Sequence, residues 1–277
     1  MKSAKYPLIH AYLLVCLGLS LLPSVLVLMA SFQRGNSLLA GFQGMSLNNY
    51  QRLLSETPFL RWMLNSLLVS ATAALVALLV TTLAGYAFAR LRFPGRKYGL
   101  LMMILLQMFP AGMAMVAVFR LLQGLGQVTG GWIGLNSLLG LALVYIGGGI
   151  PFNTWMIKGY IDSLPRELEE SAYLDGASPH QTFWQVILPL LGPILAVVGV
   201  FNFITPYSDF IFPSVLLSEG ERYTLAVGMQ GFISGNFSAN WSLFAAASIL
   251  GSLPILVLFF SVQRFLVQGL TQGAVKG

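Results

Sequence analysis

The sequence predicts an all-α polytopic membrane protein with six transmembrane helices. Hydrophobic residues make up 56% of the 277 positions, and the mean hydropathy is +0.77. Only 9% of the residues are charged. A water-soluble domain of this length could not hold so many apolar side chains without large exposed apolar patches. Because lipid offers the backbone no hydrogen-bond partner, the segments that cross the membrane must be helices.

Apolar stretches long enough to span a membrane occur six times, at 8–32, 62–88, 98–122, 137–157, 190–212 and 243–265. The second holds 27 residues. At about 1.5 Å per residue it covers roughly 40 Å, more than a hydrocarbon core of about 30 Å. The first stretch shares a basic start with secretory signal peptides. It is longer than their apolar core and lacks a small-x-small cleavage site, so we predict that it is retained, with a kink at Pro23.

The basic residues orient these segments. With both termini in the cytoplasm, ten Lys and Arg residues fall on the cytoplasmic side and five fall outside, as the positive-inside rule expects. The ten are Lys2, Lys5, Arg90, Arg92, Arg96, Lys97, Lys158, Arg166, Arg264 and Lys276. We therefore predict both termini inside, an N-terminal helix and outer loop over 1–61, a transmembrane domain over 62–265 and a cytoplasmic tail over 266–277.

The stretch from Tyr160 to Pro193 is the only long water-compatible passage between apolar segments, and it predicts two short cytoplasmic helices. It contains five of the nine acidic residues, namely Asp162, Glu167, Glu169, Glu170 and Asp175. Pro165 suits a first turn and carboxylates favour the positive end of a helix dipole, while Gly176 suits a left-handed helix end. Ser178, Pro179 and Gln181 then predict a capping box at a second helix start.

Each of these helices is about ten residues long and would be marginal alone in water. Leu164, Leu168 and Ala172 recur at helical spacing and predict a narrow apolar stripe opposite the carboxylates. The stripe is equally consistent with a helix lying on its own membrane domain and with a helix docked on a partner.

Three spaced elements in this loop resemble the EAA loop of bacterial ABC importer permeases. They are Glu170-Ser171-Ala172, Asp175-Gly176-Ala177 and Leu188-Pro189, with Ser171 at a position where that family usually has Ala. The resemblance implies a type I ABC importer transmembrane fold, with the cytoplasmic loop 160–189 seated on an ATPase subunit. The residues that it implies for ATPase coupling are Glu167, Glu170, Ser171, Ala172, Asp175 and Gly176.

The resemblance extends from about Trp62 to the end of the chain, and within the family it is strongest to the smaller permease subunit of maltose and maltodextrin transporters. The stretches that carry it are 145–160, 223–230 and 269–277. It implies a permease in the bacterial cytoplasmic membrane that moves sugar by alternating access, with a tail at 271–277 reaching toward the ATPase. It also implies an outer loop, 231–240, that reaches into the binding protein. The loop residues named for this contact are Gly231, Phe232, Gly235 and Asn236.

The partners that this resemblance implies are a homologous larger permease, two copies of a P-loop ATPase, an extracytoplasmic sugar-binding protein and membrane lipid. The chain has no Gly-x-x-x-x-Gly-Lys-Ser/Thr sequence, so ATP and Mg would be bound by the partner ATPase and the chain itself would be no enzyme and carry no cofactor. His10 and His180 are isolated, which predicts no metal site. The basic residues form no dense patch, which argues against nucleic acid.

Asn202, Thr205 and Asp209 share one face of the fifth predicted span. Polar residues at membrane depth commonly face a cavity or a partner. One interpretation is a substrate pathway for a hydroxyl-rich ligand, and the other is helix packing through small polar groups. Other sugars remain open as substrates. A secondary transporter driven by an ion gradient is the rival class, but it favours internal repeats with paired broken helices and buried acids, and the sequence shows one candidate acid and no clear repeat.

Overall fold

A computed structural model describes residues 5–35, 44–234 and 239–274. Every regular element in these ranges is a helix, and the one β feature among them is an isolated bridge between Gln33 and Met45. The all-α prediction is confirmed. The chain divides into two compact units, Met1–Met63 with Val227–Pro254 (unit 1) and Leu64–Ala226 with Ile255–Gly277 (unit 2).

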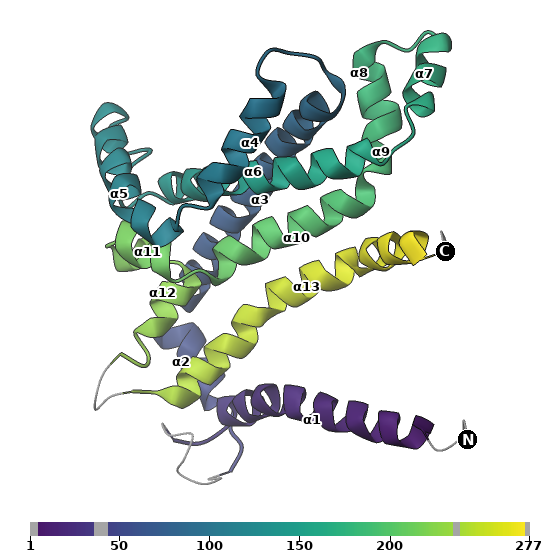
Figure 1. The fold of residues 1–277 in the computed structure, drawn as a ribbon. Helices are drawn as coiled ribbons and strands as arrows, with labels where there is room; N and C mark the ends of the chain where they lie inside the picture. Colours follow the sequence, from purple (N-terminus) through teal and green to yellow (C-terminus); the bar gives the residue numbers. More distant parts are fainter. Residues whose placement is uncertain (1–4, 36–43, 235–238, 275–277) are drawn as a thin grey trace. The chain divides into compact units, whose positions relative to one another are not determined.

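Four helices of the described chain are long and apolar enough to cross a membrane by themselves. They are α1 (Lys5–Ser31), α3 (Phe59–Arg90), α6 (Leu138–Asp162) and α13 (Trp241–Ala274), the first and last over Ile9–Ser31 and Trp241–Gln263 (Figure 1). Two bent pairs of helices have the same composition, so the total is six if each pair is one span. The six predicted segments fall on these helices and pairs.

The third predicted segment, 98–122, is not one straight helix. α4 (Arg96–Gln107) and α5 (Ala111–Val128) meet at 104°. Pro110 precedes α5 with extended backbone, φ −60° and ψ 124°. Proline lacks the N–H that would continue α4 and disfavours helical backbone in the residue before it, which explains the break. Pro151, by contrast, lies inside the unbroken α6.

The fifth predicted segment, 190–212, is also not one straight helix. α8 (Pro179–Gln181), the π-helix η1 (Thr182–Ile187) and α9 (Leu188–Leu190) run on from one another, and α10 (Gly192–Ser208) follows after a bend of 75°. Asp209 then leaves the helix with extended backbone, and a short helix, α11 (Ile211–Leu216), begins beyond it. The remaining short elements of the described chain are α2 (Asn48–Glu56), α7 (Glu167–Leu174), η2 (Gly220–Arg222) and α12 (Leu225–Gln230).

In unit 1, α2 is tied to the end of α1 by polar contacts. The Asn49 side-chain amide donates to the carbonyl oxygens of Ser31 and Gln33 at 3.0 and 2.9 Å. The Tyr50 hydroxyl lies 2.7 Å from the Ser31 hydroxyl. Leu53, one turn further along α2, is fully buried. α1 therefore ends where its last carbonyl groups find partners, which satisfies the orphan acceptors of a helix C-terminus.

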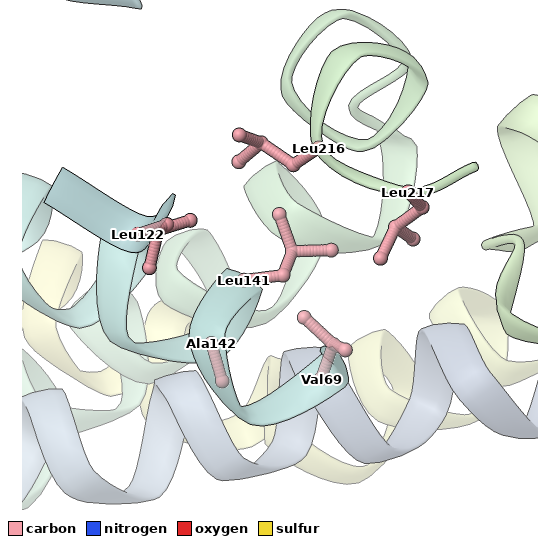
Figure 2. Close-up of a cluster of buried hydrophobic side chains, with 6 residues drawn as sticks. All are labelled: Val69, Leu122, Leu141, Ala142, Leu216 and Leu217. Atoms are coloured by element: carbon pink, nitrogen blue, oxygen red, sulfur yellow. The ribbon is translucent and has the colours of Figure 1, made fainter. Parts of the chain in front are cut away.

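Unit 2 has two clusters of buried aliphatic side chains. The first joins α3, α5, α6 and α11 through Val69, Leu122, Leu141, Ala142, Leu216 and Leu217 (Figure 2). Beside this cluster, glycines let the loop between α5 and α6 lie closely against both helices. A Cβ on Gly134 would lie 2.7 Å from the Gly126 Cα, and one on Gly140 would lie 2.5 Å from the Gly134 carbonyl oxygen. Close packing through small residues is how helices associate in lipid, where apolar burial contributes little.

The second cluster supports the loop 160–189, which was predicted to be cytoplasmic. Ala89, Ile157, Ile161, Ile187, Leu191 and Val198 are all buried and bring together α3, α6, η1 and α10. Gly85 of α3 contacts α6 so closely that a Cβ there would lie 2.8 Å from the Ile157 side chain. The segment that follows α6 is therefore attached to three long helices of unit 2.

Candidate functional site

α7 and α8 form a hairpin at one end of unit 2 (Figure 1). α7 ends at a left-handed glycine, Gly176, with φ +84°. The Ala177 N–H donates to the Ala172 carbonyl at 2.9 Å, and the Gly176 N–H donates to the Tyr173 carbonyl at 3.0 Å. These two bonds form a Schellman motif, which satisfies the last carbonyl groups of α7. The predicted helix end at Gly176 is confirmed.

The second helix begins with the predicted capping box. The Ser178 hydroxyl accepts from the Gln181 N–H at 3.3 Å, and the Gln181 side-chain oxygen accepts from the Ser178 N–H at 2.8 Å. Pro179 occupies the first helical position. Ser178, Pro179 and Gln181 thus start the second helix directly after Gly176, which gives the hairpin a defined geometry.

A buried ion pair, which the sequence analysis did not identify, attaches α7 to α3. Arg90 Nε lies 2.5 Å from Glu169 Oε1, and the two side chains are only 7% and 8% exposed. Arg90 Nη2 also donates to the Leu164 carbonyl at 3.1 Å, and the Tyr86 hydroxyl donates to Glu169 Oε2 at 3.4 Å. Each partner is therefore charged, buried and multiply hydrogen-bonded, as a stable buried pair requires.

This pair corrects the predicted orientation of α7. The apolar stripe was predicted to lie opposite the carboxylates, but the Glu169 carboxylate is buried, whereas Leu168 of the stripe is 39% exposed. Glu169 lies on the Ala172 side of the helix, since it stands three residues before it. The sequence signals for this contact are only a basic residue at the end of α3 and an acidic residue in α7. Neither residue indicates which residue it pairs with.

The outer face of α7 is apolar at its tip and acidic beside it. Leu168 and Leu174 are exposed, the latter to 89%, whereas Tyr173 stands four residues after the buried Glu169 and shares its side of the helix. Of the residues predicted for ATPase coupling, Glu167, Glu170, Ser171, Asp175 and Gly176 are exposed and Ala172 is half-buried. An apolar group in a polar rim is the usual composition of a protein–protein contact surface. Leu168 and Leu174 are named the α7 tip below.

Two of the three predicted pathway residues, Asn202 and Asp209, form hydrogen bonds to α6. Asn202 Oδ1 accepts from the Asn153 side-chain amide at 2.8 Å, and Asp209 Oδ2 accepts from the Tyr145 hydroxyl at 2.8 Å. Both partners belong to α6, so these two residues join α10 to α6. Asp209 Oδ1 also accepts from the Ile211 N–H at 2.8 Å. Thr205 is exposed, and Asn202 Nδ2 is buried without a hydrogen-bond partner.

The predicted binding-protein loop, 231–240, is described only at its two ends, 231–234 and 239–240. The Gly231 N–H donates to the Gly228 carbonyl at 3.2 Å, and the Phe232 ring lies 5.8 Å from the Trp62 ring. Gly228 lies against the Trp62 indole, where a Cβ would come within 2.1 Å of the ring. Gly235 and Asn236 lie outside the described residues. Among the described residues, no three His, Cys, Asp or Glu side chains gather into a possible metal site.

Comparison with known proteins places the chain in a family. The model of the binding-protein-dependent transport system inner membrane component matches residues 81–272. The chain belongs to this family. Such a permease resides in the inner membrane, as predicted, and its apolar helices fit a multi-pass protein. On which side the termini lie remains a prediction.

Relatives match this permease over nearly their whole length. The maltodextrin transport system permease protein MdxG of Bacillus subtilis is 40% identical over 260 residues, 92% of this chain and 90% of the relative. The galactooligosaccharides transport system permease protein GanQ of the same organism is 39% identical, covering 100% and 99%. The maltose/maltodextrin permease protein MalG of Escherichia coli is 38% identical, covering 100% and 97%. The resemblance to maltose and maltodextrin permeases is confirmed.

Solved structures confirm the fold. A bacterial ABC transporter involved in the import of the acidic polysaccharide alginate superposes with a TM-score of 0.78 at 21% identity, over 95% of this permease and 98% of that chain. The MetNI methionine ABC transporter superposes with a TM-score of 0.57 at 18% identity, over 81% and 99%. The predicted ABC importer permease fold is confirmed.

Proposed function

We propose that this permease is one membrane subunit of an ATP-driven, binding-protein-dependent importer of maltose or maltodextrins. The full-length likeness to maltodextrin and maltose permeases supports the substrate class. In this proposal a homologous larger permease supplies the other half of the pathway. Two copies of a P-loop ATPase bind ATP and Mg in the cytoplasm, and an extracytoplasmic binding protein delivers the sugar.

The α7 tip is the observation that carries the coupling role. It exposes Leu168 and Leu174 on a helix whose other side is anchored by Arg90 and Glu169. A helix of eight residues would not persist in water without such anchoring. The ATPase surface would cover the apolar tip, with Glu167, Glu170 and Asp175 at the rim of the contact.

Movement of the docked α7 would reach the membrane helices by two routes. The Arg90–Glu169 pair joins α7 to α3. The capped segment from Pro179 to Leu190 leads through a 75° bend into α10, and its Ile187 packs with Ala89 and Ile157. Closely packed helices transmit displacement with little compression. Closure of the ATPase pair would thus shift α3, α6 and α10 together and turn the pathway from inward-facing to outward-facing.

Replacing Leu174 by Asp is expected to reduce copurification of the ATPase at least tenfold, because it places a charge in the apolar centre of the contact. The measurement is the amount of ATPase that remains with affinity-purified permease. Ser171→Ala is the matched control at an exposed coupling position and should leave copurification unchanged, since it introduces the residue usual in the family. Undiminished ATPase binding in Leu174→Asp would contradict the assigned docking face.

The substrate is tested by uptake into proteoliposomes that contain the complete transporter. Labelled maltodextrins should accumulate with ATP and binding protein, and should fail to accumulate without either. Galacto-oligosaccharides are the second candidate substrate, because the GanQ relative is 39% identical over the whole of this chain. If galacto-oligosaccharides alone accumulated, they would be the substrate in place of maltodextrins. Accumulation without any ATPase would overturn the proposed class.

We retain the pathway role of Asn202, Thr205 and Asp209 as a proposal. Asn202 Nδ2 is a buried donor without a partner, and the hydroxyl of Thr205 is exposed. A hydroxyl-rich sugar could accept from the first and donate to the second. Asn202→Ala with Thr205→Ala is expected to raise the KM for sugar several-fold. Unchanged uptake and unchanged preference among sugars would leave these residues a packing role only.

A further inference from the structure

Positive charge is concentrated where α3 turns into α4. Arg92 lies on the connecting loop, and Arg96 and Lys97 are the first two residues of α4. Lys158 of α6 lines the same cavity as Arg96 and Lys97. Cations are unfavourable at the start of a helix, where the dipole is already positive and the first N–H groups lack helical partners. This corner therefore attracts an anion.

The basic side chains differ in whether the protein itself gives them hydrogen-bond or ion-pair partners. Arg96 donates to the Phe88 carbonyl at 2.7 Å and to the Ala89 carbonyl at 3.0 Å, which holds it against the end of α3. Lys158 pairs with Asp162. Lys97 is exposed, and within the described chain its ammonium group has no hydrogen-bond or ion-pair partner. No acidic side chain lines the cavity, which measures about 590 Å³.

An apolar groove continues from this cavity along α4. It measures about 470 Å³, and it is lined by Leu101, Met102 and Leu105 together with Gly95, Tyr98 and Gly99. Gly95 and Tyr98 line both the groove and the charged cavity. α4 belongs to one of the bent pairs that is apolar enough to span a membrane. A charged cavity that continues into a shallow apolar groove along one face of a candidate membrane helix matches an amphiphile with an anionic head.

We propose that this corner binds an anionic glycerophospholipid. Its phosphate and headgroup would occupy the cavity beside Arg96, Lys97 and Lys158, and one acyl chain would follow α4 from Tyr98 to Leu105. Basic pockets between membrane helices recognise anionic headgroups by the same chemistry. A zwitterionic headgroup would bring an ammonium group into a cavity with no acidic lining residue. A free phosphate would leave the apolar groove uncovered.

The position of this lipid connects it to α7. The end of α3 carries both Ala89, whose carbonyl binds Arg96, and Arg90, which binds Glu169. The loop between α3 and α4 and the α7–α8 hairpin lie at the same end of unit 2 (Figure 1). The lipid would neutralise the charge beside α3 and so hold in place the helix end to which α7 is anchored.

The test measures lipid binding to the purified, assembled transporter in nanodiscs. The binding of fluorescent phosphatidylglycerol is compared with that of fluorescent phosphatidylcholine, and inorganic phosphate serves as a competitor. Phosphatidylglycerol should bind the wild type at least tenfold more tightly than phosphatidylcholine. Lys97→Gln should weaken its binding about fivefold, as expected for loss of one interfacial charge. Arg52→Gln removes the same charge from an exposed Arg52–Glu56 pair in unit 1 and should have no effect.

Each other outcome overturns the proposal. Equal affinity for the two lipids, or unchanged binding in Lys97→Gln, would mean that the cavity does not recognise an anionic headgroup. Displacement of phosphatidylglycerol by millimolar inorganic phosphate would assign the cavity to a free anion. Met102→Ser should also weaken phosphatidylglycerol binding, because it places a hydroxyl in the apolar groove, and retained affinity in that variant would exclude the acyl-chain contact.

Discussion

Replacing Glu169 by Gln is expected to reduce sugar transport by the assembled complex more than tenfold. The substitution preserves the shape of the side chain but leaves the Arg90 guanidinium 7% exposed and without its counter-charge. Breaking a buried pair from one side costs about 3–5 kcal/mol, because the remaining ion is desolvated and unpaired. α7 would relieve this cost by detaching from α3, so ATP hydrolysis would continue while transport is lost. The measurements are uptake and phosphate release in the same proteoliposomes.

Arg90→Gln should be at least as harmful, since Arg90 also donates to the Leu164 carbonyl. The double variant Arg90→Gln with Glu169→Gln should lose less than the sum of the two single variants, because it leaves no unpaired ion. Arg52→Gln is the matched control. Its partner Glu56 lies 3.1 Å away, but the side chains are 38% and 58% exposed, and such a pair contributes about 1 kcal/mol or less. Strictly additive losses in the double variant would show that the two residues act separately.

The features that could be predicted from the sequence are local ones. The capping box depends on three residues, Ser178, Pro179 and Gln181, and the helix end depends on Gly176. The apolar spans depend on composition over about twenty residues. In each case the sequence that determines the structure is contiguous, so its physical consequence can be derived without knowing what packs against it.

The features that could not be predicted depend on pairing across the chain. Arg90 and Glu169 are 79 positions apart, and Asn153 and Asn202 are 49 apart. Asn136 is a further example, because its left-handed backbone, φ 58°, lets its side chain accept from the Ser218 N–H at 3.2 Å. Two of these residues, Arg90 and Asn202, also had an adequate local interpretation, as a topological charge and as a helix-packing amide. Only tertiary contacts distinguish those interpretations from the observed ones.

The 104° turn between α4 and α5 is an intermediate case. Pro110 lies within the third predicted segment, and the structure breaks the helix at that proline. The size of the angle has no local cause, since proline alone is compatible with either a modest kink or a full break. Pro151 confirms the point, because α6 continues through it. A proline therefore predicts where a membrane helix can change direction, while its neighbours decide how far.

Replacing Gly176 by Val is expected to uncouple ATP hydrolysis from transport while leaving membrane insertion and subunit assembly intact. Gly176 has φ +84°, and a β-branched residue is strongly disfavoured there. No atom lies within 4 Å of a Cβ at this position, so the backbone conformation alone causes the effect. The strain would open the Schellman bonds from Gly176 and Ala177 and change the direction in which α7 leaves the hairpin. Expected values are near-normal ATPase activity and at least tenfold slower uptake.

Gly176→Asn separates backbone strain from the loss of glycine itself. Asparagine enters the left-handed region far more readily than valine, and the open space around the position accepts its side chain. Its coupling ratio, sugar transported per ATP hydrolysed, should stay within about twofold of the wild type, against a tenfold or larger fall for Gly176→Val. Equal impairment of the two variants would imply that a partner packs against the bare glycine. Full coupling in both would mean that the angle between α7 and α8 plays no part in transmitting ATPase motion to α3 and α10.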